Sequence, residues 1–394
     1  TRARHRALLQ GALSEERTRE MHFRCADMVA AWVRDIRLHD TPLVVDGQDV
    51  CERFSGLLLL FCLVSTPPTL QGDFLPTHSD DATGSEEGGI GVEELLQALG
   101  RVECHVRQHA PDDPTSWWSL LFVDREVEQD LELLKEYFED RVMGRIESME
   151  KGTHRDFMFR HGCDFLDLLL VHAQESDRVL MPAELGESLV LCLLMGRAPL
   201  GAAICWTLHH LAFHPDLLDQ VLCEVDALQC PHAAPETYLT KLPVLRSCLL
   251  ESVRLHPPVP DLYTRVAGGD VNLLDVRLPD KILVLLSFDC LNRSPFADIP
   301  GDRLDSFCPE RWMRQPMDDC TSPHFPFPNA GSPPHSCPGR HFAEMAALVC
   351  LARLLQHVSV QASDLEEVQE DCRPSDEKVF FHRSSGVPLQ LGLR

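Results

Sequence analysis

The sequence predicts a mainly α-helical fold with a small β portion. Stretches with apolar residues at helical spacing fill most of the chain, whereas strand-like pieces are short and gather beyond residue 260. With 394 residues, of which 44% are hydrophobic, the chain is long enough to bury a large core. The expected order is therefore a series of helices, a few short strands, a loop-rich segment and a final helix.

The amino-terminal half is predicted to form successive helices separated by short breaks. We expect two helices within residues 1–37, with a break between Gly11 and Ser14, and further helices over 47–64, 92–108, 122–149 and 164–170. Residues 77–91 are acidic and rich in Ser and Gly, which favours a flexible loop. A long helix follows Pro182 and ends near His214, and Pro215 begins the next helix because proline fits the first helical turn.

The carboxyl-terminal half mixes helices with strands. Residues 239–255 predict a helix that ends at His256-Pro-Pro258. The strand-like pieces are 263–267, 271–278 and 282–288, and the loop-rich segment 290–336 contains nine prolines. A helix over 339–357 follows, and the tail, 377–394, is predicted to be a β hairpin.

Composition and charge exclude several function classes. The net charge of −25 argues against a nucleic-acid partner and against a broadly cationic membrane-binding surface, but leaves room for a local basic patch that binds a redox partner. The sixteen cysteines are scattered singly, without a zinc-ligand spacing or a compact disulfide framework. The chain also lacks Gly-x-Ser-x-Gly and a phosphate-binding glycine loop, so a classical hydrolase is disfavoured.

The first residues suggest that the natural amino terminus is missing. The chain begins at Thr1, and Thr1-Arg-Ala-Arg-His-Arg-Ala-Leu-Leu9 has the character of a helix interior without a cap. No signal peptide is visible, and the best apolar run, Leu57–Val64, is too short to span a bilayer. We therefore expect a truncated chain that is itself soluble.

Cys337 stands in the most informative segment of the chain. The run Phe325–Ala343 is rich in Pro and Gly and delivers one cysteine to the start of a helix. Helix N–H groups and the positive end of the helix dipole stabilise a thiolate at such a place. A haem iron bound by sulfur needs a loop of this kind. The alternative for Cys337 alone is a buried structural cysteine.

A second pattern lies 86 residues before that cysteine. Glu251-Ser-Val-Arg254 places a carboxylate and a guanidinium on one helix face. Between this pair and Cys337 lies Phe307-Cys-Pro-Glu-Arg-Trp312, whose Arg311 is placed to complete a Glu–Arg–Arg network. The alternative is an ordinary surface ion pair, which contributes at most about 1 kcal/mol.

Taken in order, these patterns resemble the cytochrome P-450 superfamily, as a divergent, eukaryotic-type and N-terminally truncated member. The matching pieces extend over nearly the whole chain: Arg6-Ala-Leu-Leu9, Ala212-Phe-His-Pro215, Glu251 with Arg254, Arg265, Asn292-Arg-Ser-Pro295, Phe307 to Trp312, and Cys337-Pro-Gly339 with Phe342-Ala343. The resemblance implies the cytochrome P-450 fold as a single domain over residues 1–394, without its N-terminal anchor and first sheet and helix elements.

The resemblance also implies roles for particular residues. It makes Cys337 the metal ligand of haem b (heme b, iron protoporphyrin IX), with sulfur bound to the iron. It makes Glu251, Arg254 and Arg311 a structural triad behind the cofactor. Its implied contacts with the haem propionates are Arg6, Arg265 and His335.

Three features of the chain depart from the family pattern. Arg2 fills a position that is usually tryptophan. The loop before Cys337 is lengthened, since Phe327 lies ten residues and Gly331 six residues before the cysteine. The acid and alcohol positions of the family's proton-delivery pair are occupied by Ala198 and Pro199, so no catalytic side chain is assigned there. Pro199 is also expected to kink its helix, because proline has no N–H to donate.

The resemblance implies an oxidoreductase, a haem-thiolate monooxygenase that oxidises a lipophilic small molecule. Its electron donor would be a flavoprotein reductase or a ferredoxin. The intact protein would sit at the cytosolic face of the endoplasmic reticulum membrane through the missing N-terminus, with a mitochondrial location as the other possibility. Two alternatives remain open: a haem-thiolate isomerase or dehydratase of lipid hydroperoxides or endoperoxides, which needs no reductase, and a non-catalytic, degenerate relative.

Overall fold

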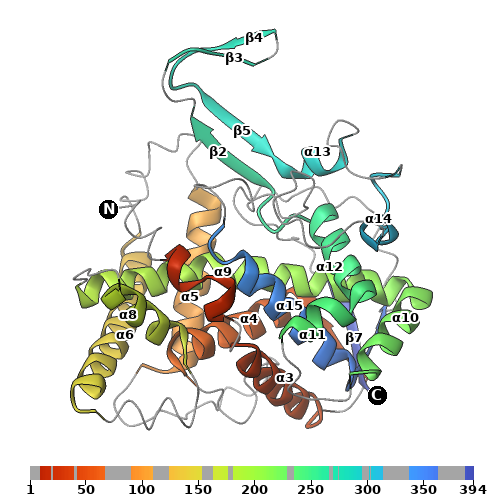
Figure 1. Ribbon diagram of the computed structural model, residues 1–394, viewed down its shortest axis with the longest axis horizontal. Helices are drawn as coiled ribbons and strands as arrows, with labels where there is room; N and C mark the ends of the chain where they lie inside the picture. The colour runs from red at the N-terminus through yellow and green to blue at the C-terminus, as the bar shows by residue number, and fades with distance from the viewer. Residues whose placement is uncertain are drawn as a thin grey trace.

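Helices dominate the computed structural model (Figure 1), which confirms the predicted mainly α fold with a small β portion. The structure describes residues 9–18, 21–39, 42–66, 90–109, 124–152, 163–175, 181–228, 235–265, 269–273, 275–294, 301, 303–313, 337–362 and 387–394. Of the expected loop over 77–91, residues 77–89 lie outside the described residues, and residues 90 and 91 precede a helix without regular secondary structure of their own.

The first described elements form one side of the core. They are α2 (Glu15–Thr18), α3 (His22–Ile36), β1 (Leu43–Asp46) and α4 (Gly47–Val64). The Asp46 carboxylate accepts a hydrogen bond from the Gln48 N–H at 2.9 Å, so it caps α4 at the predicted start of that helix. The same oxygen accepts the N–H of Val387 at 3.1 Å and thereby ties α4 to the end of the chain.

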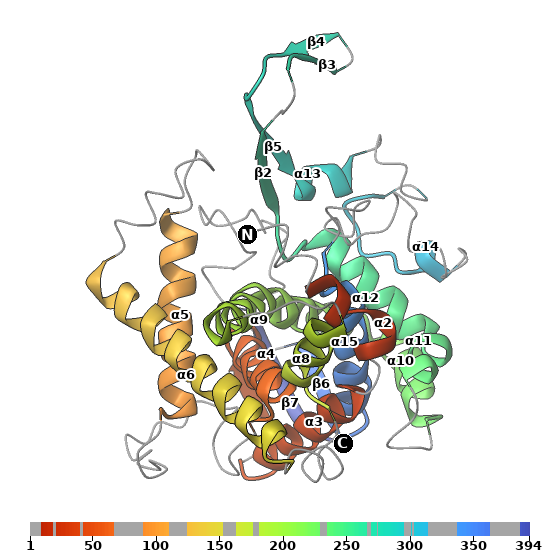
Figure 2. The same cartoon turned by 60° about the vertical axis from the view of Figure 1, so that its left-hand side comes forward.

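The central element is α9 (Pro182–Phe213), which crosses the helical body (Figures 1 and 2). It packs against α4 and against α6 (Arg125–Glu150), and the neighbouring helices are α5 (Val92–His109) and α8 (Phe165–Glu175). At Gly201 the backbones of α9 and α4 approach so closely that a Cβ atom would lie 2.8 Å from the Cα of Glu52. The glycine therefore sets the spacing of the two helices.

The remaining helices follow α9 in the chain. They are α10 (Pro215–Asp226), α11 (Pro235–Lys241), α12 (Pro243–Leu255), α13 (Phe288–Arg293), α14 (Glu310–Met313) and α15 (Arg340–Leu355). Three of them, α10, α12 and α15, pack against α9. The expected helix over 239–255 is divided into α11 and α12 at Leu242, because Pro243 takes the first helical position of a new helix. α15 packs against α3, α9 and α11 in the core.

The largest sheet joins distant parts of the chain. Its strand order is β1, β7 (Pro388–Leu393), β6 (Val358–Ala362), and both pairings are antiparallel. The described part of the tail therefore forms the central strand of a three-stranded sheet, and not one arm of a local hairpin. The hairpin expectation was wrong for β7, because its partners are residues 43–46 and 358–362.

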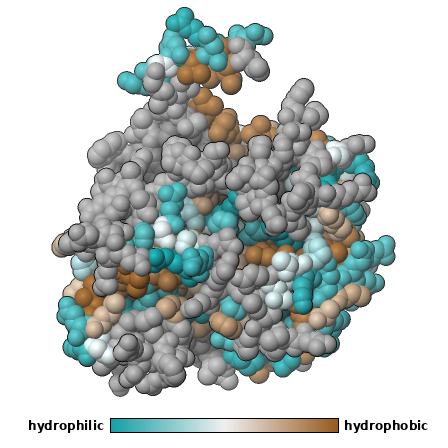
Figure 3. Space-filling model, in the orientation of Figure 1, coloured by the Kyte–Doolittle hydropathy of each residue, from teal (hydrophilic) through white to brown (hydrophobic). Residues whose placement is uncertain are grey.

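A two-stranded β arm projects from the helical body (Figures 1 and 2). Strand β2 (Asp261–Arg265) pairs with β5 (Leu283–Ser287), and β3 (Val271–Leu273) pairs with β4 (Val276–Leu278) at the tip. The single strand expected over 271–278 is thus a hairpin, which bends around Asp275. Apolar side chains at this tip are exposed and appear brown in Figure 3.

The helix α9 is long enough and apolar enough to cross a membrane. This was not predicted from the sequence, because α9 contains no uninterrupted apolar run of that length. In its most apolar window 61% of the residues are buried inside the protein, as is usual for the core helix of a globular fold. We therefore treat α9 as a core element.

Candidate functional site

Cys337 lies exposed, just before α15 begins. The Arg340 N–H is 3.5 Å from the Cys337 carbonyl oxygen, and Gly339 is the residue that precedes the helix. The thiol is therefore near the end of α15 where helix N–H groups have no partner within the helix and the dipole is positive. This environment favours a thiolate, the form that binds metals.

The two long sides of α9 differ in what covers them. Arg197 points toward α4 and α5, where it forms ion pairs with Glu52, at 3.6 Å, and with Glu103. Its carbonyl oxygen accepts a hydrogen bond from the Ser55 hydroxyl at 2.7 Å. Together with the close approach at Gly201, these contacts fix the side of α9 that faces α4.

The opposite side of α9 is partly exposed over two turns. Leu191 is 47% exposed and Met195 is 52% exposed, although α9 is otherwise mostly buried. Residues four apart lie on one helix face, so half-buried Pro199 belongs to the same side. We call Leu191, Met195 and Pro199 the open face of α9.

Cys192, beside the open face, connects it to Cys337. The pKa of the Cys192 thiol is raised to about 12, first by burial and then by the negative charge of Cys337. The helix α15, which begins after Cys337, also packs against α9. Cys337 and the open face of α9 therefore belong to one site, with an exposed thiol and an apolar helix surface.

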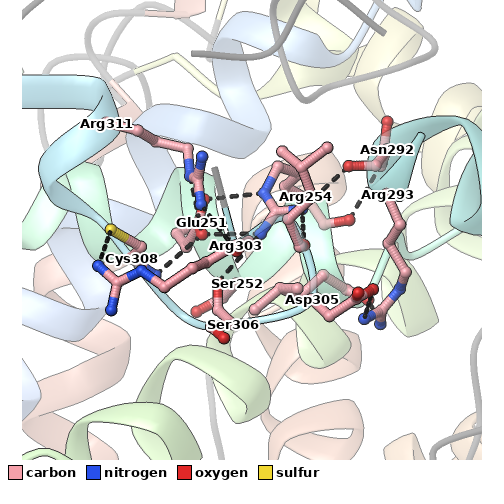
Figure 4. Close-up of polar contacts among 12 residues, drawn as sticks. Glu251, Ser252, Arg254, Asn292, Arg293, Arg303, Asp305, Ser306, Cys308 and Arg311 are labelled. Carbon is pink, nitrogen blue, oxygen red and sulfur yellow. Dashed lines mark hydrogen bonds and ion pairs between the residues drawn. The ribbon is translucent and has the colours of Figure 1, made fainter. Parts of the chain in front are cut away.

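Glu251, Arg254 and Arg311 lie together in a buried network (Figure 4). The Arg254 guanidinium donates Nε and Nη2 hydrogen bonds to the Glu251 carboxylate at 2.9 and 2.8 Å. Arg311 donates its Nε–H to the same carboxylate at 3.1 Å. The structure thus brings together the three residues that the sequence grouped.

Backbone groups complete the network and extend it to three chain segments. The Cys308 N–H donates to Glu251 at 2.9 Å. Arg254 donates to the carbonyl oxygens of Asn292 and Leu304, at 2.9 and 2.6 Å, and to that of Ser306 at 3.3 Å. The network therefore ties α12 to α13 and to the irregular segment 303–309, which a single surface ion pair would not do.

Two further sets of contacts in this region were not predicted from the sequence. Trp312 donates its indole N–H to Glu251 at 2.7 Å, a contact that depends on the fold of α14. A column of stacked rings joins α9 to the end of α12 and to Phe307: Trp206 and His256 at 3.7 Å, His256 and His210 at 5.1 Å, and His210 and Phe307 at 4.2 Å between ring centroids.

Burial in this ring column changes the titration of its histidines. Burial, followed by neighbouring positive charges, holds the pKa of His210 and of His256 well below the ordinary value. Both imidazoles are therefore neutral in the folded protein near pH 7. The sequence showed only adjacent histidines on a long helix, and the contact with Phe307 could not be read from it.

Of the other candidate site residues predicted from the sequence, some lie within the described residues and some do not. Ala198 is buried and Pro199 is half-buried within α9. Neither side chain is an acid or an alcohol. Arg265 is the last residue of β2, and its side chain lies outside the description. Arg6 and His335, like Arg2, Phe327 and Gly331, lie outside the described residues.

Comparisons with known proteins agree with one another. The family model "Cytochrome P450" matches residues 92–386. The chain is 26% identical over 324 residues to "Bifunctional cytochrome P450/NADPH--P450 reductase ALT2" of Alternaria alternata, covering 79% of this chain and 28% of the relative. It is 31% identical over 172 residues to the human "25-hydroxyvitamin D-1 alpha hydroxylase, mitochondrial", covering 43% of this chain and 32% of that protein.

Two more similarities complete the comparison. Rat "Cytochrome P450 3A1" is 29% identical over 219 residues, which are 54% of this chain and 42% of the relative. The chain thus spans less than half the length of these three curated relatives. The solved structure "Crystal structure of cytochrome P450DA heme domain" superimposes with a TM-score of 0.74, at 18% identity, over 99% of this chain and 76% of that one. The fold is therefore shared from end to end of this chain.

Proposed function

The chain belongs to the cytochrome P450 family, and from that premise we propose that it is a haem-thiolate monooxygenase acting on a lipophilic small molecule. Members of this family are oxidoreductases that bind haem b. The observation that carries the proposal is the exposed Cys337 thiol, placed near the apolar open face of α9. The structural neighbour, which covers 99% of this chain, supports treating residues 1–394 as one domain.

The residues of the site fit a flat, largely apolar cofactor that is held by sulfur. Cys337 would hold the iron, and the helix start at α15 would keep its sulfur ionised. Glu251, Arg254 and Arg311 would keep the segment 303–309 and α12 fixed behind the cofactor. Arg6, Arg265 and His335 are proposed to neutralise the propionates, because a cation or an imidazole there pairs with a carboxylate.

The remaining steps follow from what the chain itself supplies. When bound, haem supplies the activation of dioxygen, through which one oxygen atom enters the substrate and the other leaves as water. Leu191 and Met195 would exclude bulk water and bind a lipophilic substrate. Since neither Ala198 nor Pro199 carries a proton, water or a substrate hydroxyl has to bring protons to the reacting oxygen.

The proposal includes an electron donor and a location. A flavoprotein reductase is supported by the relative whose printed name joins a cytochrome P450 to such a reductase. A ferredoxin is the other proposed donor. For the intact protein we propose the cytosolic face of the endoplasmic reticulum membrane, and the relative named as mitochondrial supports mitochondria as the alternative.

A second candidate is an isomerase or dehydratase of lipid hydroperoxides or endoperoxides. It is favoured by Ala198 and Pro199, because a peroxide substrate already contains reduced oxygen and needs neither electrons nor protons from a relay. A non-catalytic relative is the third candidate, supported by the substitution at Arg2 and by the lengthened loop before Cys337.

One comparison of turnover separates these candidates. The haem-loaded protein is incubated either with a panel of lipophilic compounds, dioxygen, NADPH and a reductase, or with a fatty-acid hydroperoxide and no electron donor. Oxygenated product that requires the donor supports the monooxygenase. Consumption of the hydroperoxide without a donor, and no product in the first reaction, contradicts it in favour of the isomerase. No turnover in either reaction contradicts both and supports the non-catalytic relative.

A further inference from the structure

Pro199 removes one hydrogen bond from the middle of α9. In an α-helix, the N–H of a residue donates to the carbonyl of the residue four positions earlier. Pro199 lies inside α9 and has no N–H, so the carbonyl oxygen of Met195 loses its regular partner. A backbone carbonyl without a partner in an apolar environment is costly, and such groups are almost always paired in proteins.

The position of this carbonyl follows from the exposure of the two residues around it. Met195 is 52% exposed, and Pro199 is half-buried one turn farther along the same side of α9. The Met195 carbonyl points along the helix axis between these two side chains. It is therefore a polar acceptor set in the otherwise apolar open face.

On the side of α9 that faces α4, a side chain donates a hydrogen bond to a backbone carbonyl of the helix. There the Arg197 carbonyl accepts a hydrogen bond from the Ser55 hydroxyl of α4 at 2.7 Å. On the open face, by contrast, no side chain within the described part of the chain donates to the Met195 carbonyl. The neighbouring Leu191, one turn before Met195 on the same face, has no donor to offer.

We infer that the Met195 carbonyl is a specificity-determining acceptor, which selects lipophilic molecules carrying a hydroxyl group directed at α9. The inference rests on the proposed function, since it assumes that the open face lines the substrate site. A hydroxyl hydrogen completes the hydrogen bond that Pro199 leaves unmade, while Leu191 and Met195 contact the apolar body of the ligand. An apolar ligand of the same shape would leave the carbonyl buried without a partner.

The test measures paired ligands that differ only by a hydroxyl group. Binding to the haem-loaded full chain is measured by equilibrium dialysis for cyclododecane and cyclododecanol, decalin and decalol, and androstane and androstanol. The perturbation is Pro199→Ala, which supplies an N–H to the Met195 carbonyl. The matched control is Pro182→Ala in the first turn of the same helix, where a proline frees no carbonyl.

In Pro199→Ala the Met195 carbonyl gains the N–H of the new alanine as a partner, so a bound alcohol no longer supplies its missing hydrogen bond and competes for the second lone pair. The dissociation constants of the alcohols are expected to rise roughly three- to tenfold, which corresponds to the net contribution of one hydrogen bond. Those of the hydrocarbons should stay within about twofold, and Pro182→Ala should leave both sets unchanged.

Each other outcome has a defined meaning. A ratio of alcohol to hydrocarbon affinity that is the same in wild type and Pro199→Ala overturns the inference. Equal weakening of both ligands in Pro199→Ala also overturns it, because the proline would then act through the shape of the helix. If the wild type binds none of the six compounds, the proposed lipophilic site itself fails. The two failures are therefore distinguishable.

Discussion

Replacing Glu251 with Gln is the substitution with the largest predicted effect on stability. Its carboxylate has no exposed surface and accepts hydrogen bonds from Arg254 at 2.8 and 2.9 Å and from Trp312, Cys308 and Arg311 at 2.7, 2.9 and 3.1 Å. Glutamine keeps the shape but removes the charge that compensates Arg254 and Arg311. Removing one partner from a buried ion pair costs about 3–5 kcal/mol.

The assay is the free energy of unfolding from urea denaturation, measured for Glu251→Gln and for Glu147→Gln. Glu147 forms an exposed pair with Lys151 at 3.0 Å, with side-chain exposures of 58% and 68%. Its replacement should lower the free energy of unfolding by no more than about 0.5 kcal/mol. Equal losses in the two variants would refute the view that the buried network holds α12, α13 and the segment 303–309 together.

Two further predictions concern the helices that frame the site. Because burial lowers the pKa of His210, the unfolded chain binds more protons than the folded protein below about pH 6.5. Stability present above that pH is lost as the pH falls, and His210→Phe should reduce the loss measured between about pH 7.5 and 5.5 by urea denaturation; an unchanged loss would contradict this. Gly201→Ala should cost about 1–3 kcal/mol, because its Cβ would approach Glu52 to 2.8 Å. Gly100→Ala in α5, where a Cβ meets nothing within 4 Å, should stabilise by about 0.5–1 kcal/mol, and the reverse order would be evidence against the close helix approach.

Local signals in the sequence were enough for most helices. The apolar residues of 47–64 indicated α4, and Pro182 and Pro215 indicated the starts of α9 and α10. Each of these signals acts within a few residues, through the spacing of apolar side chains or through a missing N–H. The division at Pro243 was missed, because the apolar spacing continues across it.

Pairing between distant segments could not be predicted in this way. The tail was expected to fold on itself, whereas β7 lies between β1 and β6, more than 340 residues from its partners in β1. Strand pairing depends on which edges the helices leave available, and a local alternation of apolar and polar residues does not contain that information.

The part of the site that could be predicted is the part in which the spacing of residues along the chain decides which side chains meet. Glu251 and Arg254 lie three apart on one helix, and Arg311 follows in a motif of fixed composition, so their meeting could be expected. The open face of α9 could not be foreseen, because it is defined by what the neighbouring helices leave uncovered. The electrostatic effect of Cys337 on Cys192 likewise depends on the packing of α9 and α15.

The central claim is that the sulfur of Cys337 holds the iron of haem, and one spectrum tests it most directly. The difference spectrum of the reduced, haem-loaded protein with and without carbon monoxide is recorded for wild type, Cys337→Ala and Cys223→Ala, the last being an exposed cysteine on α10. The account predicts a thiolate-type Soret band in wild type and in Cys223→Ala, and its loss in Cys337→Ala. A band typical of nitrogen ligation in wild type, or a thiolate band that persists in Cys337→Ala, would contradict the account.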